Sequence, residues 1–107
     1  MNDNKPTVSS AFQVFSTEAP SHAKALMELA HGLDKASALD KKTGALAYLA
    51  VLAAQRMESG VPFHVMLAKK AGATRDEVIS AILVGLPAAG ISVTQCLPAA
   101  IAAYDAS

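Results

Sequence analysis

The sequence predicts an all-α fold of about six helices. Alanine, the residue with the highest helix propensity, supplies about a fifth of the chain. Apolar residues recur at the three- and four-residue spacings typical of amphipathic helices, and no alternating segment predicts a strand. Hydrophobic residues make up 52% of the sequence, but aromatic residues only 5%. Because a small monomer with so few large side chains buries little apolar area, we expect an oligomer.

The first helices are preceded by a polar segment. A length of 107 residues is typical of one domain, so we expect residues 1–107 to form a single domain. Residues 1–8 are interpreted as a loose tail. A short helix is predicted from Ser9 or Ser10 to about Phe15.

Two longer helices are predicted next. Thr17 is the expected N-cap of the first, Pro20 fits its first turn, and Gly32 is the expected stop. The second is predicted over Leu39–Glu58 and is the longest in the chain. Because it is apolar on nearly every side, we expect it to be central and buried.

The second half of the chain has clear helix boundaries. Pro62 suits the first turn of a helix, and Gly72 suits a C-terminal stop. Thr74 and Glu77 have the spacing of a capping box, which opens a helix. Pro98 predicts a kink or a restart, because proline donates no backbone hydrogen bond. The predicted helices are Pro62–Ala71, Thr74–Leu86 and Ser92–Tyr104.

Charge and cysteine content exclude several classes of function. Lys+Arg and Asp+Glu both count 9, so the net charge is zero, and no basic patch predicts nucleic-acid binding. The single cysteine, Cys96, excludes an intramolecular disulfide and a metal site built from several thiolates. His22 and His31 have no metal-ligand spacing to each other or to His64. We therefore predict no metal and no cofactor.

The longest uncharged segment is Val78–Tyr104. Glycine and proline residues interrupt it, and no basic residue anchors its far end, so we interpret it as buried helices rather than a membrane span. The first ten residues lack the apolar region of a signal peptide. We expect a cytoplasmic protein.

An ordered set of segments resembles a known family. The segment "LDKKTGALAYLAVLAA" is followed by a histidine helix, then by "AGATRDEV" with its glycine turn and capping box, and then by apolar helices. This order is similar to the alkylhydroperoxidase D-like superfamily, which includes the carboxymuconolactone decarboxylases. The resemblance covers about Ala19 to Tyr104. It implies a helical fold that assembles as dimers, trimers or hexamers.

The resemblance also implies a motif from which this chain departs. In the peroxidase branch the motif is E-x11-C-x2-C-x3-H, with a cysteine pair that cycles between thiol and disulfide. Aligned on His64, its glutamate position is Ala45, its first cysteine Met57 and its second cysteine Gly60. Since neither methionine nor glycine supplies a thiolate, we expect no cysteine-dependent peroxidase chemistry.

The decarboxylase branch, which has no cysteine pair, implies a different chemistry. It implies cofactor-free decarboxylation of a small lactone acid, for which a proton donor is needed near the developing negative charge. His64 is the candidate acid/base. The nearby charged candidates are Arg56, Glu58, Lys69 and Lys70.

A structural interpretation of the same residues is also open. His64 lies on a small-residue face and suits a buried histidine bonded to a backbone carbonyl. Met57 suits a gap-filler in the core, Gly60 a helix stop, and Cys96 an inert buried residue.

Two functions therefore remain open. The first is an enzyme with His64 as acid/base. The second is a non-catalytic homo-oligomer that binds a small apolar or carboxylated ligand or serves a structural role. A pocket containing His64 and a second titratable group would favour the first. A cavity lined by Met57, Leu49 and Ala68 would favour the second.

Overall fold

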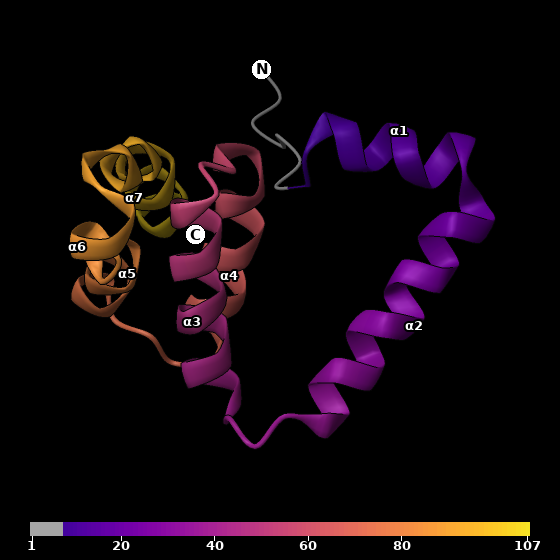
Figure 1. Ribbon diagram of the computed structural model, residues 1–107, viewed down its shortest axis with the longest axis horizontal. Helices are drawn as coiled ribbons and strands as arrows, with labels where there is room; N and C mark the ends of the chain where they lie inside the picture. The colour runs from indigo at the N-terminus through magenta and orange to yellow at the C-terminus, as the bar shows by residue number, and fades with distance from the viewer. Residues whose placement is uncertain (1–7) are drawn as a thin grey trace. The chain divides into compact units, whose positions relative to one another are not determined.

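The computed structural model describes residues 8–107, and it confirms the all-α fold (Figure 1). The tail predicted over residues 1–8 lies outside the described residues, apart from its last position. No strand occurs within residues 8–107, and six of the α-helices there have nine residues or more. The elements are α1 (Ser10–Glu18), α2 (Pro20–Ala36), α3 (Lys41–Ala54), the 3-10 helix η1 (Glu58–Gly60), α4 (Val61–Lys70), α5 (Arg75–Leu83), α6 (Leu86–Ala89), the 3-10 helix η2 (Ile91–Cys96) and α7 (Leu97–Ala106).

The chain divides into two compact units. Unit 1 extends to Asp40, and its described part holds α1 and α2. Unit 2 is Lys41–Ser107 and holds α3 to α7 with both 3-10 helices. Among the described residues of unit 1, only Ala23 is buried. The hydrophobic core and His64 both belong to unit 2.

Two predicted helix boundaries in unit 1 are wrong. Thr17 lies inside α1, where its hydroxyl donates to the Gln13 carbonyl at 2.9 Å, so it does not cap the next helix. The N-cap of α2 is Ala19, followed by Pro20 at the first helical position. Gly32 does not end α2, which continues to Ala36 because an isolated glycine within a helix is tolerated at a cost of about 1 kcal/mol.

The helix predicted over Leu39–Glu58 is shorter than expected and is not the longest. α3 has 14 residues and ends at Ala54, whereas α2 has 17. Arg56 ends α3 by adopting a left-handed backbone with φ 58. Its N–H donates to the Ala53 carbonyl at 3.1 Å, and the next N–H, of Met57, donates back to Leu52 at 2.9 Å. This pair of bonds is a Schellman closure, a motif that usually places glycine where Arg56 stands.

Unit 2 has its own hydrophobic core. α3 packs against α4, α5 and η2, and α4 packs against α7. α3 is central, as predicted, but it is not buried throughout, because Tyr48 and Val51 are 49% and 54% exposed. The buried core residues are Leu49, Leu52, Ala53, Val61, Val65, Ala68, Ala73, Val78, Ile82, Val93, Cys96 and Ala100.

The turn between α4 and α5 agrees with its prediction. Gly72 has φ +99, and the N–H groups of Gly72 and Ala73 close α4 by donating to Lys69 and Ala68. The capping box is present, since the Thr74 hydroxyl accepts from the Glu77 N–H while the Glu77 carboxylate accepts from the Thr74 N–H.

The uncharged segment after α5 is divided among several short helices. α5 ends at Leu83, three residues before the predicted boundary, and α6 forms separately. The segment predicted to start the last helix is the 3-10 helix η2, and Pro98 lies in the first turn of α7. Pro98 therefore marks a restart rather than a kink. Within residues 8–107, no helix has the length and apolar character needed to cross a membrane.

Candidate functional site

His64 lies in the first turn of α4. Val61, Val65 and Ala68 are fully buried and hold α4 against the core, so the neighbouring His64 is half-buried at the edge of this face. The imidazole ring lies 4.3 Å from the Tyr48 ring, centroid to centroid, with an interplanar angle of 37°. Packing of α4 on α3 thus brings His64 onto an aromatic side chain that is distant in sequence.

A second aromatic ring also contacts the imidazole. The Phe63 ring lies edge-on to His64, with a centroid distance of 5.3 Å and an interplanar angle of 89°. Phe63 is 38% exposed and Tyr48 is 49% exposed. We call these three side chains the aromatic cluster. It presents partly exposed rings beside a half-buried imidazole.

The surroundings of His64 favour the neutral form of its imidazole. Burial lowers its pKa below the ordinary value of 6.5, because a partly buried site disfavours the charged form. Within residues 8–107, neither ring nitrogen has a hydrogen bond or ion pair, so the predicted bond to a backbone carbonyl is not found there. A neutral imidazole has one nitrogen that donates a proton and one that accepts one.

The three positions aligned with the family's motif carry no titratable group. Ala45 lies on α3, partly buried against the core. Met57 is 51% exposed, so the prediction that it fills a gap in the core is wrong. The early end of α3 explains this, because Met57 lies in the connection to η1 rather than on a packed helix. Gly60 ends η1, and a Cβ there would lie 3.4 Å from a Leu52 methyl group, which is ordinary contact.

Cys96 does not replace the missing thiols. It is fully buried between η2 and α7 and belongs to the hydrophobic core. Burial raises the pKa of its thiol, and the negative charge of Glu58 raises it further. Since the thiolate is the reactive form, this cysteine is unreactive at neutral pH.

None of the charged residues predicted near His64 forms an ion pair with it within residues 8–107. The Lys69 ammonium donates to the carbonyls of Tyr104 at 2.9 Å and Ser107 at 2.6 Å, and it lies 4.5 Å from the centre of the Tyr104 ring. Lys69 therefore ties α4 to the end of α7. Lys70 is exposed at the C-terminal end of α4. Arg56 and Glu58 are exposed around the connection from α3.

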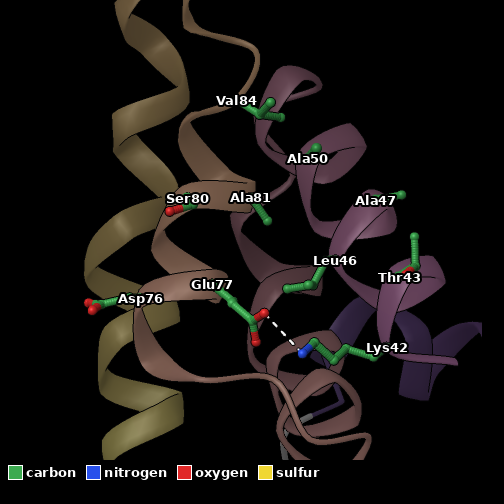
Figure 2. Close-up of a pocket in the computed structure, with 10 residues that line it drawn as sticks. All are labelled: Lys42, Thr43, Leu46, Ala47, Ala50, Asp76, Glu77, Ser80, Ala81 and Val84. Atoms are coloured by element: carbon green, nitrogen blue, oxygen red, sulfur yellow. Dashed lines mark ion pairs between the residues drawn. The ribbon is translucent and has the colours of Figure 1, made fainter.

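A separate groove of about 560 Å³ lies between α3 and α5 (Figure 2). Leu46, Ala50 and Ala81 supply apolar surface, and the ion pair between Lys42 and Glu77 at 2.9 Å lies among its lining residues. The sequence did not predict this groove. The available signal was a set of small residues at helical spacing on the two elements, which is also typical of close helix packing.

Neither predicted pocket matches this groove. His64 does not line it, so it is not the predicted cavity with an imidazole and a second titratable group. Leu49 and Ala68 are fully buried in the core, and Met57 lies outside the groove lining. Within the described residues, no group of three or more His, Cys, Asp or Glu side chains is placed to hold a metal ion.

Comparison with known families gives a match that covers most of the chain. The sequence matches the profile of the Carboxymuconolactone decarboxylase family over residues 20–104, most of its length. Comparisons with curated proteins and with solved structures found no match. On the extent of the profile match, this chain belongs to the carboxymuconolactone decarboxylase family.

Proposed function

We propose that this protein is a cysteine-independent member of its family that uses His64 for acid/base chemistry on a small lactone or carboxylate metabolite, without a cofactor. The observation that carries the proposal is a half-buried imidazole, packed against two aromatic rings, whose nitrogens have no protein partner within residues 8–107. Within residues 8–107, no buried side-chain nitrogen lacks a partner, so the unbonded ring nitrogens of His64 reach solvent. A ligand at the surface can therefore contact them.

The position of His64 suits proton transfer near neutral pH. A general base must be unprotonated before reaction, and burial lowers the pKa of His64, which favours the unprotonated imidazole. The N-terminal end of a helix also disfavours a positive charge, so the first turn of α4 acts in the same direction. After taking a proton, the imidazolium is a strong donor and returns the proton readily. A proton shift within a substrate uses both steps, whereas decarboxylation uses only the donation of a proton.

Thiol chemistry is not part of the proposal. The attacking and resolving positions are Met57 and Gly60, and the remaining cysteine, Cys96, is buried with a raised pKa. Peroxide reduction requires an accessible thiolate to be oxidised and then regenerated. We expect no peroxide turnover in the presence of a dithiol reductant.

The proposal is tested with a His64→Gln variant. Glutamine keeps a polar side chain of similar length but does not exchange protons near neutral pH. Against a panel of charged and uncharged γ-lactones, we expect kcat/KM to fall by about 100-fold or more, the usual effect of removing a general acid/base. The matched control is His31→Gln, on an exposed position of α2, which we expect to keep full activity. Equal activity of wild type and His64→Gln on every substrate would contradict the proposal.

A second candidate function is a non-catalytic homo-oligomer that binds a small ligand. It is favoured by large apolar side chains that are exposed on α3 and α4, which include Tyr48, Val51, Phe63 and Leu67. If no lactone is turned over and His64→Gln changes only stability, this function is preferred. Light scattering at micromolar concentration tests the oligomer itself, and a monomer would exclude it.

A further inference from the structure

The orientation of the His64 imidazole is not set by a hydrogen bond. Within residues 8–107, neither ring nitrogen bonds to the protein, and the ring contacts are those of the aromatic cluster. A partner on one ring nitrogen usually fixes the orientation of a histidine and decides which nitrogen carries the proton. For His64, the packing of the ring has to supply that orientation instead.

The two ring contacts of His64 come from different elements. Phe63 precedes His64 on α4, and its ring meets the imidazole edge-on at 5.3 Å. Because both residues belong to one turn of α4, Phe63 moves with His64 and does not hold it against the rest of the protein. Tyr48 lies on α3, and its ring packs obliquely on the imidazole at 4.3 Å, with an interplanar angle of 37°. Of the two contacts, the one with Tyr48 joins the imidazole to a second helix.

Tyr48 is carried by a rigid part of the fold. Leu49, the next residue on α3, is fully buried, and so are Val61 and Val65 on α4, which lie before and after His64. α3 and α4 pack against each other through this core. Since a close-packed core holds its helices in one arrangement, the backbones that carry the two rings keep a fixed separation. The Tyr48 ring therefore limits how far the imidazole tilts.

We propose that Tyr48 is the positioning residue of His64: its ring holds the imidazole in the orientation from which a nitrogen exchanges a proton with the substrate. The inference rests on the proposed acid/base function of His64 and adds a second residue to it. The ring has this role and the hydroxyl does not, because the hydroxyl of Tyr48 has no hydrogen bond in the described part of the chain. A misplacement of about 1 Å costs about 100-fold in rate, so loss of the ring has a measurable effect.

The orientation of the imidazole is measured by NMR on protein that contains 13C-labelled histidine. The signals of His64 are those that are missing from His64→Gln. In the wild type we expect high order parameters for the ring C–H bonds, and upfield shifts of their protons caused by the Tyr48 ring. Tyr48→Leu should lower the order parameters and remove the shifts, while Tyr48→Phe should keep both. Ring order in Tyr48→Leu equal to that of the wild type would overturn the proposal.

Two further variants control this measurement. Phe63→Leu removes the contact that belongs to α4 itself, and we expect it to lower the ring order of His64 less than Tyr48→Leu does. An equal or larger loss in Phe63→Leu would assign the positioning role to Phe63. Tyr48 is 49% exposed, so its substitution leaves the core in place. Tyr48→Met, a second variant without a ring, should agree with Tyr48→Leu.

Kinetics separate positioning from binding. With the γ-lactones of the panel, we expect Tyr48→Leu to lower kcat by about 10- to 100-fold and to leave KM within about twofold, because lost orientation acts on the proton transfer. Tyr48→Phe keeps the ring and should have a kcat within about twofold of the wild type. A rise in KM with an unchanged kcat would assign Tyr48 to substrate binding and overturn the positioning role.

The two proposals fail in different ways. If Tyr48→Leu lowers the ring order but the wild type turns over no lactone, the acid/base function fails and the positioning role of Tyr48 stands. If His64→Gln abolishes turnover while Tyr48→Leu keeps both its ring order and its kcat, the acid/base function stands and the positioning role fails.

Discussion

The two ends of α4 differ in how their polar groups are used. At the C-terminal end, Gly72 closes the helix, and Lys69 donates to carbonyls at the end of α7. The Tyr104 hydroxyl donates to the Ala73 carbonyl at 2.8 Å. At the N-terminal end, the imidazole of His64 has ring contacts but no hydrogen bond within residues 8–107.

This difference indicates that the C-terminal end of α4 supports the fold, while the end that carries His64 is available for function. Directional bonds at the C-terminal end fix where α4, α5 and α7 meet, and their donors are already engaged. A donor that is engaged by the protein is not available to a ligand without a cost in stability. A ligand that binds the His64 imidazole breaks no hydrogen bond of the protein within residues 8–107, so its binding carries no such cost. We therefore expect substitutions at the C-terminal end to change stability, and substitutions at the His64 end to change activity.

The largest effect on stability is expected for Gly72→Ala, at the C-terminal end of α4. Gly72 has φ +99, which an L side chain rarely adopts, although no atom within 4 Å would block a Cβ. The cost is therefore conformational, and we expect the free energy of unfolding to fall by about 1–2 kcal/mol. Denaturant titration measures it.

The control for that change is Gly32→Ala. Gly32 lies inside α2, and nothing within 4 Å would meet an added Cβ. Alanine is the better helix former, so we expect a gain of about 0.5–1 kcal/mol at this position. A loss of stability at Gly32 equal to that at Gly72 would show that the φ value of Gly72 is not the cause.

The next largest effect on stability is expected from removing the hydroxyl of Tyr104, with Tyr48 as the comparison. Tyr104→Phe removes the hydroxyl that donates to the Ala73 carbonyl, and we expect a loss of about 1 kcal/mol. The Tyr48 hydroxyl has no hydrogen bond within residues 8–107, so Tyr48→Phe should change stability by less than about 0.5 kcal/mol. Thermal unfolding of both variants makes the comparison. Equal losses would contradict the contrast between the two ends of α4.

A smaller and opposite effect is expected for Arg56→Gly. Arg56 occupies the left-handed position of a Schellman closure, as Gly72 does, but with φ 58 and a side chain. Glycine relieves that conformation, and the greater freedom of glycine in the unfolded chain offsets part of the gain. We expect the free energy of unfolding to rise by about 0.5 kcal/mol. Arg56→Ala keeps the strained backbone and should show no gain, so an equal gain in both variants would point to the arginine side chain instead.

The same two closures show what could be predicted from the sequence. Gly72 and the capping box of Thr74 and Glu77 were predicted correctly, because each motif is made by the residue types that favour it. The end of α3 was placed too late, because Arg56 forms a glycine-type closure and no residue type in the sequence signals it. The end of α2 was placed too early, because the predicted stop, Gly32, lies inside the helix. The sequence predicts the end of a helix only where the closing conformation strongly favours one residue type, such as glycine.

The site was predicted less fully than the fold. His64 was the residue on which the family motif was aligned, but its contact with Tyr48 depends on how α4 packs on α3. Met57 was expected in the core because methionine adapts to packing, and its exposure follows from the early end of α3. The groove between α3 and α5 also depends on packing. Contacts between distant segments carry no local pattern, so neither feature could be read from one sequence.

The smallest effect on stability is expected from the titration of His64, because a single half-buried group contributes it. Its pKa is lower in the folded protein than the ordinary value of 6.5 expected for the unfolded chain. Above that value both states are neutral at His64, and its contribution to stability is complete. As the pH falls below it, the unfolded chain binds the proton first, so stability decreases until the folded protein also binds it.

This pH dependence is measured as a difference between two proteins. The free energy of unfolding of wild type and His64→Gln is compared between about pH 8 and about pH 5, where histidine titrates. We expect the wild type to lose more stability on acidification than the variant does. His22 and His31 are present in both proteins, so the difference between the two proteins reports on His64. If the difference has the opposite sign, the imidazolium of His64 is stabilised in the folded protein, which would contradict a pKa lowered by burial.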